Sequence, residues 1–272
     1  MNERKIPDLT SPGRHLLNSS TVKNLDEYAS LLLSAGLAGT KTSHGSKGNL
    51  DKIDRLLNGD PKNTFGLERL LKSVEFEEAY EAATEQIGNP PDKEENPGRG
   101  CIDPTRTAAG LVKAGERIRE TAESSGKFVF ATGHPGAMLL YYLGLNRWVG
   151  ELGAEALTVE TDTVYKRGSY LDWMESVAVL GDRASLLHSH EPKPMQEALE
   201  KLGPVDLVVA DHGFAGAAIA KGIPTIAVMD TNDPALAVVA GRGAEGLTII
   251  PIDDNRPPNS YAAALEVIKS VS

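Results

Sequence analysis

Histidine and aspartate residues recur in short clusters along the second half of this chain, each directly after a stretch of apolar residues. Imidazoles exchange protons near neutral pH, and carboxylates bind hard divalent cations such as Mg²⁺. If the fold gathers these groups in one place, they could support metal-assisted hydrolysis or acid–base catalysis. The clusters are Thr132 to Gly136, Glu160 to Asp162, His188 to His190, Asp211 to Gly213, Asp230 to Asp233, and Asp253 to Asn255.

The elements that would position these clusters follow from the apolar stretches themselves. Six short runs, rich in branched apolar residues, predict strands over 128–132, 156–160, 184–188, 205–210, 225–229 and 247–252. Helical patterns separate most of them, over 136–152, 195–202, 214–221 and 234–241. This alternation predicts an α/β fold with a doubly wound, mostly parallel, Rossmann-like sheet. Residues 176–180 are expected to pair with 184–188 as an antiparallel hairpin.

Open α/β sheets bind their ligands outside the carboxyl ends of the strands. Nearly every predicted strand ends in one of the polar clusters, so we expect the clusters to share one edge of the sheet. A single Asp or Asn at such a position is an ordinary turn or helix-capping residue. The repetition from strand to strand favours a ligand site.

The turn from Thr132 to Gly136 is a candidate phosphate cradle. Free backbone N–H groups at the start of a helix favour an anion, so Thr132, Gly133 and Gly136 are candidate phosphate contacts. His134 is a candidate acid, base or phosphate donor. The turn lacks the Lys-Ser/Thr ending of a Walker A loop and does not match GxGxxG. An ordinary tight turn between a strand and a helix explains it equally well.

Three aspartates that follow predicted strands, Asp162, Asp211 and Asp230, are the candidate metal ligands. Their oxygens would hold Mg²⁺ or another divalent cation. Asp211 is also a candidate catalytic residue, and the alternative is that it caps the following helix. Asp233, which precedes a proline, fits a helix cap. That assignment leaves Asp230 and Asn232 to face the crevice, with Asn232 as a substrate contact.

Two further groups complete the predicted crevice. His190 and His212 join the candidate acids and bases, although His188 and His190 could equally be a half-buried and a loop histidine. Lys166 and Arg167 form a basic stretch that could draw a phosphate into an acidic protein. The alternative for these two cations is a solvated hairpin tip.

The first 125 residues are predicted to be helical and contain no strand-like run. Helical spacing covers 24–37, 49–57, 67–87 and 103–124, and residues 86–99 have the composition of a linker or exposed loop. We therefore divide the chain into a helical cap region, 1–125, and a Rossmann-like α/β core, 126–272. The cap would close the crevice and select the substrate, with the glycine-rich stretch 43–49 and Arg106 as candidate lid contacts.

The composition excludes several classes of protein. Among 272 residues, 28 are Lys or Arg and 38 are Asp or Glu, which gives a net charge of −10. This charge argues against general binding to nucleic acid or to an anionic membrane. The N-terminus has no apolar signal-peptide core and no apolar run could span a bilayer, so we expect a cytoplasmic protein. The single cysteine, Cys101, excludes an intrachain disulfide or a thiolate metal cluster.

Residues 127–262 resemble an actinobacterial family that is labelled simply "phosphatase". The resemblance is carried by Thr-Gly-His-Pro at 132–135, His-Ser-His-Glu-Pro at 188–192, Ala-Asp-His-Gly at 210–213 and Asp-Thr-Asn-Asp-Pro at 230–234. It implies the hydrolysis of phosphomonoesters and assigns no catalytic residue.

Together these observations predict a metal-assisted hydrolase, a phosphomonoesterase that acts on a small phosphorylated metabolite. His134, His190 or His212 would activate water or protonate the leaving oxygen. Two alternatives stay open: a non-catalytic module that binds a metabolite or nucleotide, and a lyase or cyclase that acts on a small acid. The sequence leaves a homo-oligomer open as well.

Overall fold

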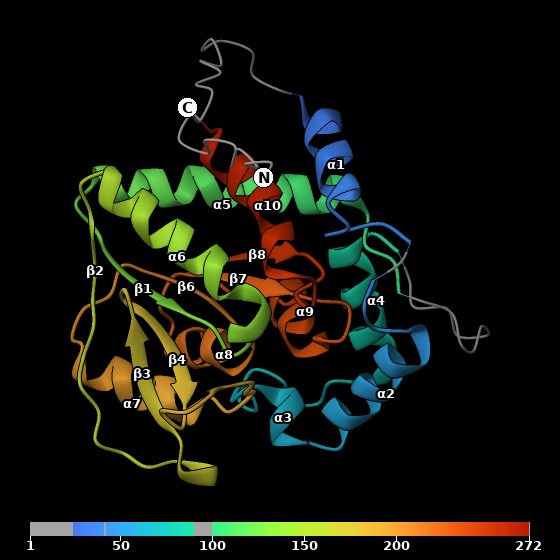
Figure 1. The fold of residues 1–272 in the computed structure, drawn as a ribbon. Coiled ribbons are helices and arrows are strands. Elements are labelled where there is room, and N and C mark those ends of the chain that lie inside the picture. The colour runs from blue at the N-terminus through green and yellow to red at the C-terminus, as the bar shows by residue number, and fades with distance from the viewer. Residues whose placement is uncertain (1–23, 41, 90–99, 272) are drawn as a thin grey trace, which may run out of the picture.

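A computed structural model describes residues 24–40, 42–89 and 100–271, which build one eight-stranded sheet between two layers of helices (Figure 1). The strands lie in the order β3-β4-β1-β6-β7-β8, and β2 and β5 pair with β1 and β4. Only β3–β4 and β4–β5 are antiparallel pairs, so the predicted mostly parallel α/β sheet is confirmed. The strands are β1 (Lys127–Ala131), β2 (Glu155–Ala156), β3 (Tyr170–Met174), β4 (Val177–Gly181), β5 (Leu186–Leu187), β6 (Leu207–Asp211), β7 (Thr225–Met229) and β8 (Leu247–Pro251).

Helices bury both faces of this sheet. One apolar core forms under α1 (Leu25–Ser34), α5 (Pro104–Glu123), α6 (Pro135–Glu151) and α10 (Ala262–Lys269). The opposite core forms under α2 (Ser46–Leu57), α3 (Pro61–Thr64), α4 (Phe76–Ile87), α7 (Lys193–Lys201), α8 (His212–Ala220) and α9 (Pro234–Gly241). Helices from the first half of the chain therefore cover both faces, and the boundary at residues 125 and 126 stays a prediction.

The sheet reverses its order between β1 and β6, which are neighbours although they are far apart in sequence. After β1 the chain runs through α6, β2 and β3 to β4 on one side, and after β5 and α7 it returns to β6 on the other side. From β6 it continues outward to β7 and β8. Ligands of doubly wound sheets bind at such a reversal, outside the carboxyl ends of the strands. In this protein those ends carry His134 and His212.

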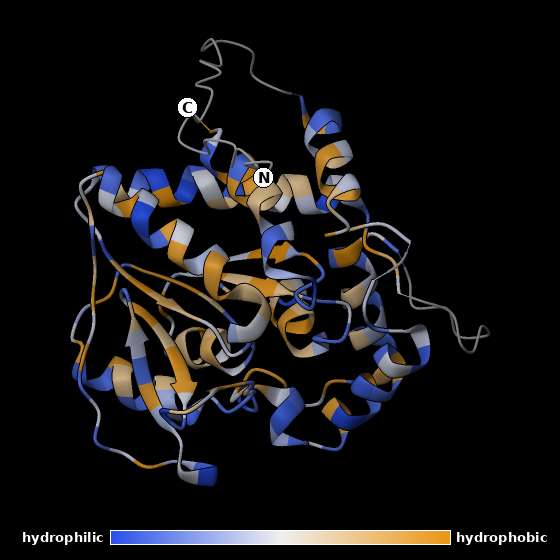
Figure 2. Cartoon of the chain, in the orientation of Figure 1, coloured by the Kyte–Doolittle hydropathy of each residue, from blue (hydrophilic) through white to orange (hydrophobic). Residues whose placement is uncertain are grey.

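Helices α8 and α9 follow β6 and β7 and are buried along almost their whole length, because α7 and α3 pack against α8, and α4, α2 and α3 pack against α9. Figure 2 shows α9 in hydrophobic colours, whereas α2 and α5 alternate between hydrophilic and hydrophobic colours. Small residues let α8 lie close to its neighbours: a Cβ on Gly216 would stand 2.0 Å from the backbone oxygen of Phe65. The starts of both helices are thus held by packing on all sides.

The structure differs from several sequence predictions in its details. The hairpin between 176–180 and 184–188 is confirmed, with Leu180 opposite Leu187, but β5 has only two residues. The predicted strand at 156–160 is likewise reduced to β2, and β3 was not predicted. The predicted helix 67–87 begins only at Phe76, because Ser73 has a left-handed backbone (φ 56°) that a helix cannot accommodate.

Most of the predicted linker, residues 90–99, lies outside the described residues. Within the described part of the chain, none of the helices is both long enough and apolar enough to cross a bilayer.

Candidate active site

The five histidines that the structure describes gather at the reversal point of the sheet, although they come from four separate segments of the chain. The rings of His134 and His188 stack at 4.3 Å, and those of His190 and His212 stack at 4.4 Å. His188 and His190 also approach each other, with 3.0 Å between their Nε2 atoms. His44 reaches the same region from the first half of the chain and contacts Asp230. The predicted convergence of distant imidazoles is therefore present.

The carboxylate of Asp211 joins the end of β6 to the end of β1. Its Oδ2 accepts a hydrogen bond from Thr132 Oγ1 and its Oδ1 accepts one from the Gly133 N–H, both over 2.6 Å. The Thr132 hydroxyl in turn accepts from the His134 N–H. Asp211 stands at the N-cap of α8 but makes no side-chain capping bond there. Its carboxylate orders the β1 turn, and it also lies 3.2 Å from His212 Nδ1.

These bonds bear on the roles predicted for the first turn. The N–H groups of Gly133 and His134 have acceptors within the protein and hold the turn, and the phosphate cradle stays a prediction. Thr132 is fully buried and serves the same framework. Gly136 lies in the first turn of α6 and has open space beside its Cα. Its assignment as a phosphate contact stays a prediction.

Two glycines allow the 188–191 loop to reach this edge of the sheet. A Cβ on Gly133 would stand 2.2 Å from the Ser189 backbone oxygen, and one on Gly213 would stand 2.2 Å from the His190 backbone oxygen. No real Cβ tolerates such distances, so only glycine fits at either position. The loop is also held by a bond from the Ser189 N–H to the Gly133 oxygen. Through these contacts His188 and His190 lie against His134 and His212.

His212 occupies the centre of the cluster and is only 2% exposed. It adopts a left-handed backbone (φ 46°), which is unfavourable for a residue with a side chain and is found at functional turns. The position between β6 and α8 directs its ring along the sheet edge. Its Nε2 lies 3.2 Å from Asp254 Oδ2 and 3.9 Å from Asp233 Oδ2.

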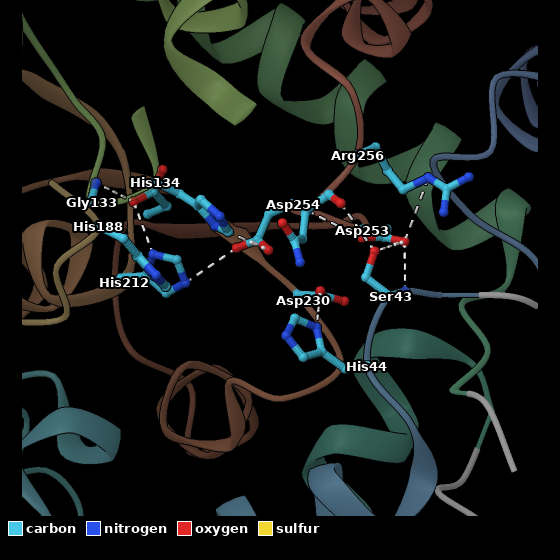
Figure 3. Close-up of polar contacts among 12 residues, drawn as sticks. Ser43, His44, Gly133, His134, His188, His212, Asp230, Asp253, Asp254 and Arg256 are labelled. Carbon is cyan, nitrogen blue, oxygen red and sulfur yellow. Dashed lines mark hydrogen bonds and ion pairs between the residues drawn. The ribbon is translucent and has the colours of Figure 1, made fainter. Parts of the chain in front are cut away.

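Asp254 lies between two imidazoles (Figure 3). Its Oδ1 is 3.4 Å from His134 Nδ1, while its Oδ2 faces His212. The side chain comes from the segment after β8 and is almost completely buried. Burial alone would raise the pKa of Asp254, but the facing imidazoles of His134 and His212 hold it well below the usual value. Asp254 is therefore an anion at neutral pH.

Two groups of three side chains could hold a metal ion, and they share His212. The first contains His134, His188 and His212, and the second contains His212, Asp233 and Asp254. Within each group the ligand atoms lie within 4.8 Å of one another. Three buried atoms of these residues lack a partner with good hydrogen-bond geometry in the described chain: His134 Nδ1, Asp233 Oδ1 and Asp254 Oδ2, of which the first and last lie within ion-pair distance of other members of the cluster. Buried polar atoms normally have partners, so these atoms fit a divalent cation.

The protonation states of the clustered imidazoles differ, and His188 is the member of the ligand groups whose state in the metal-free protein suits a metal ligand. Burial and the positive charge of His212 lower the pKa of His188 to about 4, with a contribution from His134. The same two causes lower the pKa of His190 to about 3. Both rings are thus neutral at physiological pH, the form in which imidazole binds a metal. His212 and His134 have raised pKa values, because the nearby carboxylates outweigh their burial, so a metal bound by these rings would have to displace their protons.

A second polar group lies beside the histidine cluster and connects the first half of the chain to the sheet. His44 Nδ1 is 2.7 Å from Asp230 Oδ2, and the pair is visible in Figure 3. Burial opposes the charge of His44, but its hydrogen bond to Asp230 raises its pKa to about 9. The segment that carries His44 is anchored next to it, since Asp253 Oδ2 accepts from both the N–H and the hydroxyl of Ser43.

The remaining predicted residues fall into two classes. Asp230 is buried and engaged with His44 and the Thr231 N–H, and Asn232 is nearly buried with its Oδ1 unpartnered among the described residues. Both lie at the sheet edge, but neither belongs to a metal-ligand group. Asp162 is exposed and also stands outside both groups. The predicted ligand set of Asp162, Asp211 and Asp230 is therefore not brought together.

Lys166 and Arg167 lie on the short 3₁₀ turn η1 (Lys166–Gly168) and line a cleft of about 740 Å³ that reaches His188 and His190. Lys166 pairs with Glu191 over 2.6 Å. Both cations are exposed, as a solvated tip would be. They also line the rim of the cleft, which is where the predicted recruitment of phosphate would need them.

The sequence-based ligand set contained none of the five residues of the two ligand groups: His134 and His212 were predicted as acids or bases, and His188, Asp233 and Asp254 were given no place among the predicted site residues. Asp233 was assigned to a helix cap, yet its carboxylate makes no capping bond and accepts from the Asp230 N–H. The available signal for Asp254 was its position after the last strand of the sheet. No local pattern could have paired His44 with Asp230, because 186 residues separate them.

Comparison with known proteins extends the sequence resemblance into the first half of the chain. The chain is 33% identical over 212 residues to a protein named Phosphatase SCO2771 from Streptomyces coelicolor, an alignment that covers 76% of this chain and 80% of that protein. A family model described as "Phosphatase" matches residues 23–268, a span that includes His44 and all members of the two ligand groups. The chain therefore belongs to the Phosphatase family.

Proposed function

We propose that this protein is a metal-dependent phosphatase that hydrolyses phosphomonoesters of small metabolites. The family and the relative named phosphatase support a phosphatase-type hydrolase. The observation that carries the proposal is the pair of three-residue ligand groups that share His212 at the reversal point of the sheet. His134 and His188 would complete one group, and Asp233 and Asp254 the other.

The donor set bears on the identity of the metal. Three of the five side chains are imidazoles, which suit zinc, iron and similar transition metals better than Mg²⁺. Two carboxylates keep the site compatible with harder ions. The sequence-based prediction of Mg²⁺ is therefore retained as one arm of the test, next to Mn²⁺ and Zn²⁺.

A bound divalent cation would polarise a phosphoryl oxygen and lower the pKa of a coordinated water. The chain itself would hold and orient the reacting groups. Asp254 faces His134 and His212 and fixes both rings, and Asp211 fixes His212 from the other side. Aromatic contact with Phe65 further restrains the rings of His190 and His212.

His190 is a candidate proton acceptor whose tautomer is fixed by its surroundings. Its Nδ1 lies 2.7 Å from the backbone oxygen of Lys62 and must donate a proton to it. The neutral ring therefore carries its lone pair on Nε2, which points toward His188. In the metal-free protein this lone pair accepts the N–H of His188, so His190 could take a proton from an attacking water only once that bond is released and its lowered pKa rises. Lys166 and Arg167 at the cleft rim would offset the repulsion between an anionic substrate and an acidic protein.

The test is a panel of phosphomonoesters assayed after treatment with EDTA and again after addition of Mg²⁺, Mn²⁺ or Zn²⁺, with release of inorganic phosphate as the readout. We expect turnover with at least one metal and its loss in EDTA. His212→Gln and Asp254→Asn should each reduce kcat/KM by about 100-fold or more. Lys113→Gln, an exposed change on α5, is the control and should leave turnover unchanged.

The outcomes separate the alternative functions. Metal-dependent release of phosphate supports the proposal. Binding of phosphonate analogues without any turnover would instead indicate a non-catalytic metabolite-binding module. Conversion of a metabolite without release of phosphate would indicate a lyase or cyclase.

A further inference from the structure

The cleft beside the histidine cluster is larger than the hydrolysis of a simple phosphate ester requires. Its volume is about 740 Å³, within the range of pockets that enclose a whole organic ligand. His188 and His190 form one part of its wall, so the cleft opens directly onto the proposed reaction site. A bound molecule could thus place one end at the imidazoles and extend away from them.

The lining of this cleft has the opposite charge to the rest of the protein. Six of its side chains are cationic and one is anionic, in a chain with a net charge of −10. The anionic side chain is Glu191, and it is already paired with Lys166. The six cations are Lys52, Arg55, Lys62, Lys166, Arg167 and Lys193.

These cations come from elements that are far apart in the sequence. Lys52 and Arg55 belong to α2, Lys62 belongs to α3, and the others lie on η1 and α7. In Figure 1, α2, α3 and α7 lie on the side of the sheet that also holds α8. The fold, not a local run of basic residues, collects the charge.

Most of this positive charge is not neutralised within the protein. Lys193 pairs with Glu197 of its own helix. For Lys52, Arg55, Lys62 and Arg167, the described chain places no carboxylate within ion-pair distance. The charge of Lys52 is also close enough to His190 to contribute to the lowered pKa of that ring. Free cations in a shaped cleft attract an anionic ligand.

Apolar side chains complete the lining. Val164, Leu180, Leu187 and Pro194 lie among the cations. They provide contacts for a carbon skeleton between anionic groups.

We propose that this cleft binds a second anionic group of the substrate, so that the preferred substrate is a phosphomonoester that carries a further carboxylate or phosphate some distance from the reacting phosphate. The inference rests on the proposed function for the location of the reacting phosphate. Lys52 and Arg55 on α2 are the residues assigned to the second anionic group, because both line the cleft and neither has an ion-pair partner in the described chain.

Alkylphosphonates of three to eight carbons are suitable probes, because they bind without being hydrolysed. Each is compared by calorimetry with the phosphonate of equal length that ends in a carboxylate, and with the one that ends in a second phosphonate. The length series covers the unknown distance between the two subsites. At one or more lengths we expect the second anion to tighten binding about tenfold, and added salt to reduce this preference.

The preference is the ratio of the dissociation constants of the phosphonates without and with the second anion. The double variant Lys52→Gln/Arg55→Gln should bring this ratio close to one, whereas Arg55→Lys and the control Lys113→Gln should retain the preference. No preference at any length in the parent protein, or an unchanged preference in the double variant, would overturn the proposal. The carboxylate and phosphonate arms show which anion is preferred.

The same comparison is repeated with the hydrolysable phosphate esters. If esters are not hydrolysed but the preference among phosphonates persists and depends on Lys52 and Arg55, then the proposed function fails and the anion subsite stands. If esters are hydrolysed with equal kcat/KM whether or not they carry a second anion, the subsite proposal fails and the phosphatase proposal stands.

Discussion

Asp211 accepts a hydrogen bond of 2.6 Å from the hydroxyl of Thr132, and this bond ties the end of β6 to the end of β1 where the sheet reverses its order. Both side chains are fully buried. His212 directly follows Asp211 in the sequence, and His134 lies two positions after Thr132. The bond therefore sets the spacing of the strand ends from which two metal-ligand candidates extend.

Thr132→Val should destabilise the fold while preserving the shape of the side chain. The change removes one donor to a buried carboxylate, at a cost of about 1–3 kcal/mol in the free energy of unfolding. Thr132→Ser keeps the hydroxyl and should cost less. Urea unfolding in EDTA measures both variants, and equal stability of the valine and serine variants would contradict the role given to this bond.

Gly213→Ala should weaken both the fold and the activity. The added Cβ would stand 2.2 Å from the His190 backbone oxygen, so the 188–191 loop would have to move away from β6. Such overpacking costs about 1–3 kcal/mol. Thermal unfolding and phosphatase assays on the same preparation measure the two effects.

Gly136→Ala is the matched control, because nothing lies within 4 Å of the Cβ that it would add. In a helix, alanine is preferred over glycine by up to about 1 kcal/mol, so the variant should be as stable as the parent or more so. A loss of activity without loss of stability would support the sequence-based prediction that a phosphate approaches Gly136 closely. Destabilisation equal to that of Gly213→Ala would contradict the packing argument.

Much of the architecture could be predicted because it depends on local patterns. The alternation of apolar runs and helical spacing predicted the parallel sheet, and the strand ends predicted where polar side chains converge. His134 and His212 follow β1 and β6 directly, so the general rule for ligand binding in α/β sheets was sufficient to identify them.

The exact ligand set depends on contacts that no local pattern contains. Asp211 looked like a metal ligand, but two donors from the neighbouring strand occupy its oxygens. Asp233 looked like a helix cap, but its carboxylate turns toward Asp230 and His212. In each case the side chain has the predicted position, and a partner from the end of another strand contributes to its role. Such partners are known only once the sheet order is known.

His188→Gln should lower metal affinity, because it removes one member of the imidazole group. We expect binding weakened by roughly 10- to 100-fold, the range seen for disturbed metal sites. His44→Gln is the matched control, since His44 contacts Asp230 outside both ligand groups. The two variants are compared by their metal content after dialysis against a weak chelator, measured by mass spectrometry. Equal metal loss from both variants would argue against the assigned ligands.

In metal-free protein, acidification should reduce stability between pH 6.5 and about 4 through His188 and His190. Burial and the charge of His212 lower the pKa of His190 to about 3, whereas an unfolded histidine titrates near 6.5. In this window the unfolded chain binds more protons than the folded one, so the free energy of unfolding falls as the pH falls. His190→Gln should therefore show a shallower acid-side slope than the parent in urea unfolding at a series of pH values.

His44→Gln should show the opposite dependence, because the pKa of His44 is raised to about 9 by its hydrogen bond to Asp230, which outweighs its burial. The stabilisation from a protonated His44 is fully present below pH 6.5 and is lost as the pH rises through 9. Relative to the parent, this variant should lose most stability below pH 6.5 and little above pH 9. Identical pH slopes for the parent and both variants would show that the two imidazoles do not have the assigned charge states.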